Sequence, residues 1–128
     1  MQYLLPLFAL AAPLVLLPIE KLLPYPYLIE ELTKSLILQP SFDNPMKIRL
    51  QTTVLVGLLF ALSENLLYLS DAMALGSLAE WGKRVLITTP FHIATCLIIT
   101  ISTLKGKKFL PLGILLAVLV HYAFNVLA

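Results

Sequence analysis

The chain has 128 residues, of which 59% are hydrophobic and 12% are charged, and its mean hydropathy is +0.92. An ordinary soluble domain is about half apolar and about a quarter charged, so this composition argues against a soluble domain and indicates an integral membrane protein in a lipid bilayer. The net charge of +2 is small and its basic residues are scattered among loops, which argues against nucleic acid as a partner. The single cysteine, Cys96, excludes an internal disulfide. We expect one transmembrane domain over residues 1–128.

Five segments along the chain are predicted to be helical. The first, over about 2–19, has no basic residue ahead of its apolar run, so we interpret it as a retained span rather than a cleaved signal peptide. The second begins among the prolines of PYPY and ends near Leu38, which suits either a short span or a re-entrant segment. Residues 39–45, QPSFDNP, have the composition of a loop.

Three further helices are expected over about 50–69, 84–104 and 109–127. The mixed stretch 70–83 suits a surface loop with Trp81 at the membrane interface. The prediction is therefore an all-α, polytopic bundle of about five membrane spans. The alternative has four spans, with the second segment as a re-entrant or interfacial helix.

Ionisable and amide side chains occur inside segments that are otherwise apolar enough to cross a bilayer: Glu64, Asn65, His92, His121 and Asn125. A charged side chain near the bilayer centre costs roughly 2.5–3.5 kcal/mol on insertion scales, so such residues usually face a protein interior or a water-filled cavity. We interpret the five residues as parts of one polar site within the membrane.

The expected depths of these residues agree if the chain makes five crossings. At about 1.5 Å per residue, Glu64 lies roughly 8 Å, His92 roughly 12 Å and His121 roughly 9 Å from helix ends on one face of the membrane. Glu30 and Glu31, roughly 8 Å into the second helix, reach the same depth on the same side. A four-span count with the two glutamates in an inner loop would put them on the opposite face, so we favour five.

The basic residues near the segment ends suggest an orientation. The face away from the site collects Lys47, Arg49, Lys105, Lys107 and Lys108, against Lys21, Lys83 and Arg84 on the site's side. Because cytoplasmic loops carry an excess of Lys and Arg, this division predicts that the site faces the extracytoplasmic side.

The motif EELTK carries the acidic residues. Glu30 and Lys34 are four residues apart on a helix, so we expect them to pair and to leave Glu31 about 100° away. Two adjacent carboxylates in a low-dielectric site do not both ionise readily, which is one way to prepare a general acid or base. The alternative is a solvated, amphipathic helix face.

His121 and Asn125 have the same four-residue spacing, so both side chains could donate hydrogen bonds to one oxyanion. Taken singly, an intramembrane His or Asn also serves as a hydrogen bond between helices. Arg84, at the membrane boundary, suits either the site or a lipid phosphate.

Four motifs in one order, EELTK, GLLFALSENLLY, RVLITTPFH and HYAFN, resemble the PrsW family of intramembrane proteases. They are more distantly similar to CAAX-processing and bacteriocin-immunity proteases, although the lysine at position 34 favours PrsW. The resemblance covers about residues 29–125. It implies an all-helical protein of a prokaryotic cell membrane that hydrolyses peptide bonds near the membrane surface, and PrsW itself is linked to first-site cleavage of a membrane-anchored anti-sigma factor. The matching positions are Glu30, Glu31, Lys34, Glu64, Asn65, Arg84, His92, His121 and Asn125.

From this we expect an endopeptidase that acts on membrane-anchored protein or peptide substrates and needs no cofactor. Glu30 or Glu31 would deprotonate water that His92 helps to position, and His121 and Asn125 would stabilise the oxyanion. Four residues would support the site or bind substrate: Lys34, Glu64, Asn65 and Arg84. The sequence leaves open whether Glu64 pairs with Lys34 or Arg84, or orients a histidine.

Three alternatives stay open at this point. The first is a zinc-dependent protease, whose ligands would have to converge from separate helices because no H-E-x-x-H motif is present. The second and third are a non-catalytic membrane scaffold and a proton-linked transporter, which also use buried acids and histidines. Members of the family commonly have more helices than this chain, so we expect a homo-oligomer as one way of enclosing the cavity.

Overall fold

The computed structural model describes residues 4–128, which contain helices and turns but no strand. The long elements are α1 (Leu5–Leu22), α2 (Pro26–Leu38), α3 (Met46–Ala74), α4 (Leu78–Ser102) and α5 (Leu110–Leu127). Short 3-10 turns join them: η1 (Gln39–Ser41), η2 (Thr103–Lys105) and η3 (Lys107–Phe109). The all-α prediction is confirmed, and the last predicted helix agrees with α5 to within one residue at its start. The first two residues of the expected first helix lie outside the described part of the chain.

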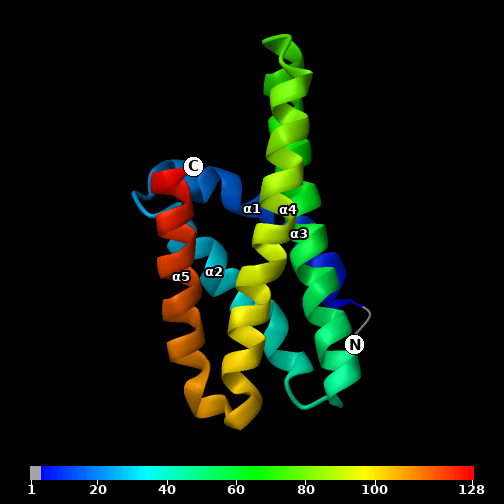
Figure 1. Ribbon diagram of the computed structural model, residues 1–128, viewed down its shortest axis with the longest axis vertical. Helices are drawn as coiled ribbons and strands as arrows, with labels where there is room; N and C mark the ends of the chain where they lie inside the picture. Colours follow the sequence, from blue (N-terminus) through cyan, green and yellow to red (C-terminus); the bar gives the residue numbers. More distant parts are fainter. Residues whose placement is uncertain (1–3) are drawn as a thin grey trace.

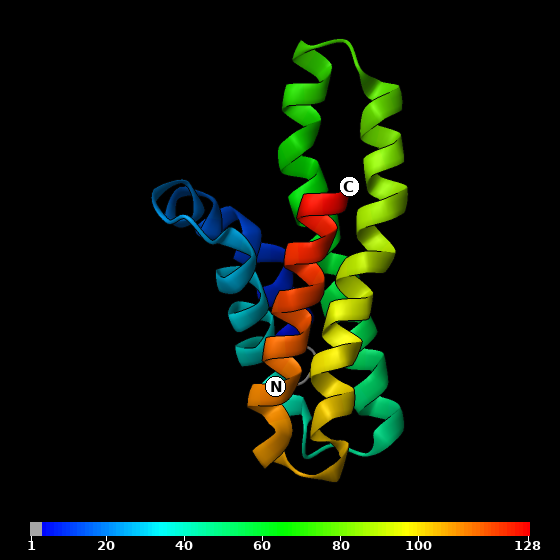
Figure 2. The same cartoon turned by 60° about the vertical axis from the view of Figure 1, so that its left-hand side comes forward.

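Among the described residues, α1, α3, α4 and α5 are long and apolar enough to cross a membrane. The 13 residues of α2 are about 20 Å long, which is shorter than a hydrocarbon core of about 30 Å. The chain nevertheless runs down through α2, up through α3, down through α4 and up through α5 (Figures 1 and 2). The helices therefore alternate between two ends, as expected for five crossings, while the length of α2 matches the alternative of four spans and a shorter helix.

The predicted surface loop at 70–83 is wrong. α3 continues to Ala74 and α4 already begins at Leu78, so only three residues join the two helices. Gly76 supplies the turn with a φ of 70°, a conformation that costs glycine little. The polar residues of this stretch instead cover a helical hairpin that projects beyond the other helices (Figure 1).

A glycine brings α3 and α4 into close contact below the site. A Cβ atom on Gly57 would lie 2.7 Å from the Cα of Ile93 and 3.0 Å from the carbonyl oxygen of His92. Small residues allow such backbone approach between membrane helices, where apolar burial alone provides little drive for association. Glu64 lies two turns after Gly57 on the same face of α3, so this contact places Glu64 beside His92.

Hydrogen bonds between side chains fix the register of the same two helices. The hydroxyl oxygens of Thr53 and Thr100 are 2.8 Å apart, and the Asn65 amide donates to Thr88 Oγ1 at 2.9 Å. Apolar packing fills the space around these bonds with Leu38, Val56, Phe60, Cys96, Ile99 and Ala117, all fully or almost fully buried. The core therefore combines small apolar contacts with polar bridges, which is typical of helices packed within a membrane.

Candidate active site

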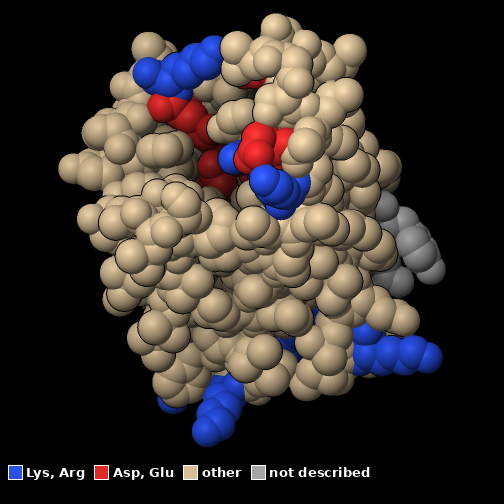
Figure 3. All heavy atoms as spheres, turned by 45° about the horizontal axis from the view of Figure 1, so that its top comes forward, with Lys and Arg blue, Asp and Glu red and all other residues tan. Residues whose placement is uncertain are grey.

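A hollow of about 700 Å³ opens among the site-side ends of the helices. Acidic atoms lie deep inside an opening in the surface, with basic atoms beside them (Figure 3). Five of the predicted site residues line this hollow: Glu30, Glu64, Arg84, His121 and Asn125. These residues come from α2, α3, α4 and α5. The side chains that the sequence placed at a similar depth in the membrane therefore lie around one hollow.

The EELTK motif lies within α2, but its lysine pairs with a different glutamate from the one predicted. Lys34 Nζ lies 2.7 Å from Glu31 Oε1, and both side chains are fully inaccessible to solvent. The expected pair between Lys34 and Glu30 is wrong. Contacts with His92 and Thr95 of α4 place the Lys34 ammonium beside the fully buried Glu31 instead. Glu30 is thereby left at the hollow.

Lys34 reaches across to α4 as well. Its ammonium lies 2.9 Å from His92 Nδ1 and donates to Thr95 Oγ1 at 3.2 Å, in addition to its bond with Glu31. An ammonium group has three N–H donors and no acceptor, and here three partners surround it. The buried charge is therefore both paired and fully hydrogen-bonded, which is the condition for keeping it inside a protein.

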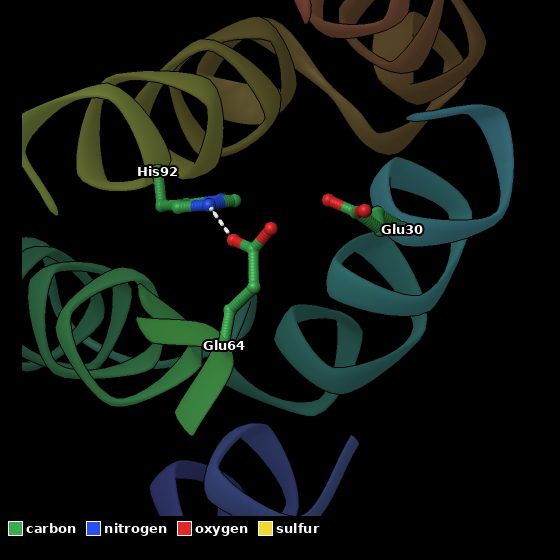
Figure 4. A group of neighbouring side chains, drawn as sticks. All are labelled: Glu30, Glu64 and His92. Carbon is green, nitrogen blue, oxygen red and sulfur yellow. Dashed lines mark hydrogen bonds and ion pairs between the residues drawn. The ribbon is translucent and has the colours of Figure 1, made fainter. Parts of the chain in front are cut away.

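Glu64 lies between a histidine and an arginine. Its Oε2 is 2.5 Å from His92 Nε2 (Figure 4), and its Oε1 accepts a hydrogen bond from Arg84 Nη2 at 3.2 Å. The Arg84 guanidinium also lies 3.8 Å from the ring centre of Tyr68, in cation–π geometry. Of the partners that the sequence left open for Glu64, the structure has Arg84 and a histidine rather than Lys34, and Arg84 lines the hollow beside Glu64.

His121 contacts both glutamates of α2. Its Nδ1 is 2.8 Å from Glu31 Oε1, and its Nε2 is 3.7 Å from Glu30 Oε2. Asn125, one turn later on the same face, is exposed and lines the hollow, as the four-residue spacing predicts.

Asn65 is the predicted site residue that points elsewhere. Its amide group exchanges hydrogen bonds with Thr88 Oγ1, and its backbone carbonyl accepts one from the indole N–H of Trp81 at 2.8 Å. Asn65 therefore joins α3 to α4 beside the site, and Trp81 lies within α4 at this junction rather than in the predicted loop.

A small cavity of about 20 Å³ lies beneath the hollow, lined in part by Glu20, Glu30, Glu64 and Tyr68. A volume of roughly 10–15 Å³ measured in this way holds one water molecule. Glu30 is 7% exposed, and its Oε2 is buried without a hydrogen-bond partner. Sequence reasoning missed Glu20 and Tyr68. The available signal for Glu20 was its position at the end of the first apolar run, which lies on the site's side of the membrane.

Residues 27–128 match the model of a family described as "PrsW family intramembrane metalloprotease". The chain belongs to the PrsW family. Neither the search of curated proteins nor the search of solved structures gave a match. The resemblance to PrsW seen in the motifs is thus confirmed, whereas kinship with CAAX-processing and bacteriocin-immunity proteases stays a prediction.

Membership in PrsW makes the chain an integral membrane protein of a protease family, with membrane-anchored substrates. The matched region begins with α2 and contains every site residue that the sequence predicted. It does not include α1, so Glu20 enters the site from outside the PrsW match.

The PrsW family description names a metalloprotease, and the site contains a group of side chains of the types that bind metal ions. Glu30, Glu64 and His92 each offer one ligand atom, and these atoms lie within 4.8 Å of one another (Figure 4). Two carboxylates and one imidazole are suitable ligand types for an open zinc site. A metal-bound histidine, however, almost always donates its other ring N–H to an acceptor, and His92 Nδ1 instead faces the Lys34 ammonium, which is a donor. The ligand types fit a metal, but the hydrogen bonding of His92 does not.

Proposed function

We propose that this PrsW-family chain is an intramembrane endopeptidase in which Glu30 activates the attacking water. The observation that carries the proposal is that Glu30 has a buried Oε2 without a hydrogen-bond partner and lines a cavity large enough for one water molecule. A buried carboxylate oxygen without a partner is unfavourable, and a bound water would satisfy it. A general base must lie within hydrogen-bond reach of the proton that it removes, and a water in this cavity meets that condition.

Glu31 is a poor candidate for the same role. Its Oε2 is also buried without a hydrogen-bond partner, but Glu31 lines neither the hollow nor the small cavity. Its Oε1 already interacts with Lys34 at 2.7 Å and with His121 at 2.8 Å, and the side chain has no exposure to solvent. We assign Glu31 a structural role, in which it neutralises the lysine and orients the histidine.

The other residues complete a reaction scheme. As hydroxide adds to the substrate carbonyl carbon, the proton of the water passes to Glu30 and from there to His121 Nε2, 3.7 Å away. His121 then returns this proton to the leaving nitrogen when the C–N bond breaks. Asn125, beside His121 on the rim of the hollow, donates to the oxyanion, and Glu64, held by His92 and Arg84, accepts the second hydrogen of the water.

The depth of the site suggests where a substrate is cut. Glu64 is the nineteenth residue of α3, roughly 27 Å from the helix start, so the carboxylates lie near one membrane face rather than at its centre. We infer that the scissile bond lies where a substrate's membrane anchor emerges, and the distribution of Lys and Arg favours the extracytoplasmic face.

The test compares membrane proteomes from cells that carry wild type, Glu30→Gln or Glu80→Gln. Glu80 is an exposed glutamate of the hairpin and serves as the control. A positioned general base contributes roughly 10²- to 10⁴-fold, so proteins cleaved by wild type and by Glu80→Gln should accumulate uncut with Glu30→Gln. Undiminished cleavage by a folded Glu30→Gln variant would exclude the proposal.

A zinc-dependent protease is the second candidate, because the family description and the ligand group of Glu30, Glu64 and His92 favour it. Metal analysis of the purified protein, together with cleavage assays before and after chelation, separates the two mechanisms. Activity that survives removal of all metal supports the glutamate mechanism. Activity that is lost on chelation and restored by zinc supports the metal.

A further inference from the structure

We infer that Lys34 is a positioning residue that holds His92 in the tautomer protonated at Nε2, so that His92 donates to Glu64 and does not offer this nitrogen to a metal. The inference depends on the geometry around His92. Only its consequence for catalysis rests on the proposed function.

The first step is the charge of Lys34. Its nitrogen lies 2.7 Å from Glu31 Oε1, and an adjacent carboxylate favours the ammonium form. The ammonium then has three hydrogens for three neighbours: Glu31, His92 and Thr95. Since it has no lone pair, it cannot accept a hydrogen bond from His92.

The second step is the consequence for the imidazole ring. His92 Nδ1, 2.9 Å from Lys34 Nζ, must accept, because an N–H there would point at another N–H. A neutral imidazole carries one ring hydrogen, which is therefore on Nε2. This nitrogen lies 2.5 Å from Glu64 Oε2, an acceptor, so both ends of the ring agree on the same tautomer.

The surroundings of His92 supply no competing partner at Nδ1. Phe60 of α3 and Phe91 of α4 contact the ring at centroid distances of 5.4 Å and 5.8 Å, and His121 of α5 packs edge to face at 5.9 Å. Among the described residues, Lys34 of α2 is thus the hydrogen-bonding neighbour of His92 Nδ1.

His121 provides an internal contrast. Its Nδ1 faces Glu31 Oε1, an acceptor, at 2.8 Å, so the neutral ring carries its hydrogen on Nδ1. The two imidazoles of the site are therefore held in opposite tautomers, one by a cation and the other by an anion. These are the only histidines in the sequence, so a histidine-specific spectrum reports both without overlap from elsewhere.

The experiment is nitrogen NMR of the full chain labelled with ¹⁵N-histidine, in lipid nanodiscs and metal-free buffer near neutral pH. His92→Gln and His121→Gln assign the two rings. We expect one ring protonated at Nε2, assigned to His92, and one protonated at Nδ1, assigned to His121. Protonation of His92 at Nδ1 in wild type would overturn the inference without any further variant.

Two substitutions at the lysine contact sharpen the test. Lys34→Met removes the donor at Nδ1 but leaves the acceptor Glu64 at Nε2, so the Nδ1 signal of His92 should shift toward that of an unbonded imidazole nitrogen and some of the Nδ1-protonated tautomer should appear. Thr95→Val removes another acceptor of the same ammonium but leaves the contact with His92, so this control should keep the wild-type spectrum. An unchanged His92 signal in a folded Lys34→Met variant would contradict the inference.

Cobalt(II) provides a second readout that needs no substrate. Because partners of a metal-bound histidine change affinity by roughly 10- to 100-fold, Lys34→Met should bind cobalt more tightly than wild type by that order. Cobalt binding to wild type that is as tight as to Lys34→Met and that disappears with His92→Gln would overturn the inference. Failure of the Glu30 proposal would appear instead as unchanged cleavage by Glu30→Gln, with the NMR result unaffected.

Discussion

Glu30 and Glu31 are adjacent in the sequence but have different partners in the structure. Glu31 belongs to a buried group with Lys34 and His121, whereas Glu30 faces the hollow and the small cavity beneath it. Breaking a buried ion pair by removing one partner strands the other charge in a low-dielectric interior. Replacing Glu31 by Gln should therefore mainly reduce stability, whereas replacing Glu30 by Gln should mainly reduce cleavage.

Glu31→Gln should lower the free energy of unfolding by about 3–5 kcal/mol, because Lys34 would remain buried without its counter-charge. Thermal unfolding in detergent measures the change. Glu80→Gln is a matched control, since Glu80 pairs with Lys83 at the same three-residue spacing and a similar distance, 2.8 Å, but on an exposed surface. The control should unfold like wild type. Equal stability of the two variants would show that the Lys34 pair contributes little.

Spacing could predict that one glutamate of EELTK is held by the lysine, but not which one. Positions three and four residues away are both neighbours on a helix, and contacts from α4 and α5 decide between them. The partners of His92 and His121 lie 58 and 90 residues away in the chain, so no local pattern encodes them. The residue types and depths were readable from the sequence, whereas the hydrogen bonds required the fold.

At the scale of helices, the approach of α3 to α4 determines whether Glu64 meets His92. Gly57 is a point of tight packing, and the atoms facing it belong to the backbone of α4 and cannot rotate away. Glycine 82, by contrast, faces open space in the projecting hairpin. The two glycines therefore allow the same substitution to be compared in opposite settings.

Gly57→Ala should destabilise the protein by about 1–3 kcal/mol, the usual cost of overpacking, and should reduce cleavage by moving Glu64 away from His92. Gly82→Ala should keep wild-type stability or exceed it slightly, because alanine is the better helix former. Thermal unfolding and the proteomic cleavage assay measure both effects. A fully active and stable Gly57→Ala variant would mean that α3 and α4 tolerate separation.

α1 contributes to the site although the family match begins after it. Glu20 lines the small cavity together with Glu30 and Glu64, so we expect it to hydrogen-bond the water held there. Asp71 also lines the outer hollow but does not line this cavity, which makes it the appropriate control.

Glu20→Gln should reduce turnover by roughly 10-fold or more, since hydrogen bonds to charged groups are worth about 1.5–3 kcal/mol. Asp71→Asn should leave turnover near the wild-type value. Initial rates of cleavage of a reconstituted substrate measure this difference. Equal rates for the two variants would place Glu20 outside the reaction.

The helix predictions were accurate within the apolar, membrane-spanning segments. They failed at the polar ends of α3 and α4, where the apolar residues stop but the helices continue. The expected loop at 70–83 is mostly helix, because polar side chains suit a helix that leaves the lipid as well as they suit a loop. Only Gly76, with its positive φ, marked the true turn. Composition therefore predicts where a membrane helix crosses, but not how far it continues beyond the membrane.

At the scale of the whole molecule, charge is unevenly distributed between the two ends. Lys47, Lys105, Lys107 and Lys108 lie at the end opposite the hollow, together with the α2–α3 and α4–α5 connections. Fewer basic residues lie on the hollow's side: Lys21, Lys83 and Arg84. Because cytoplasmic loops carry an excess of Lys and Arg, this distribution favours a hollow that faces the extracytoplasmic side.

We therefore expect the C-terminus, which lies on the side of the hollow, to be extracytoplasmic. A reporter fused after Ala128 that is active only outside the cytoplasm should give signal, and a reporter fused into the turn at 105–108 should not. The opposite pattern would place the hollow in the cytoplasm.

The shortness of α2 has a consequence for the surrounding lipid. A helix of about 20 Å beside longer neighbours creates hydrophobic mismatch, which a bilayer relieves by becoming locally thinner or by admitting water and headgroups. Since α2 carries Glu30 at its upper end, this depression lies directly above the acid. We therefore expect local thinning of the bilayer beside α2 to give water a shorter path from the membrane surface to Glu30.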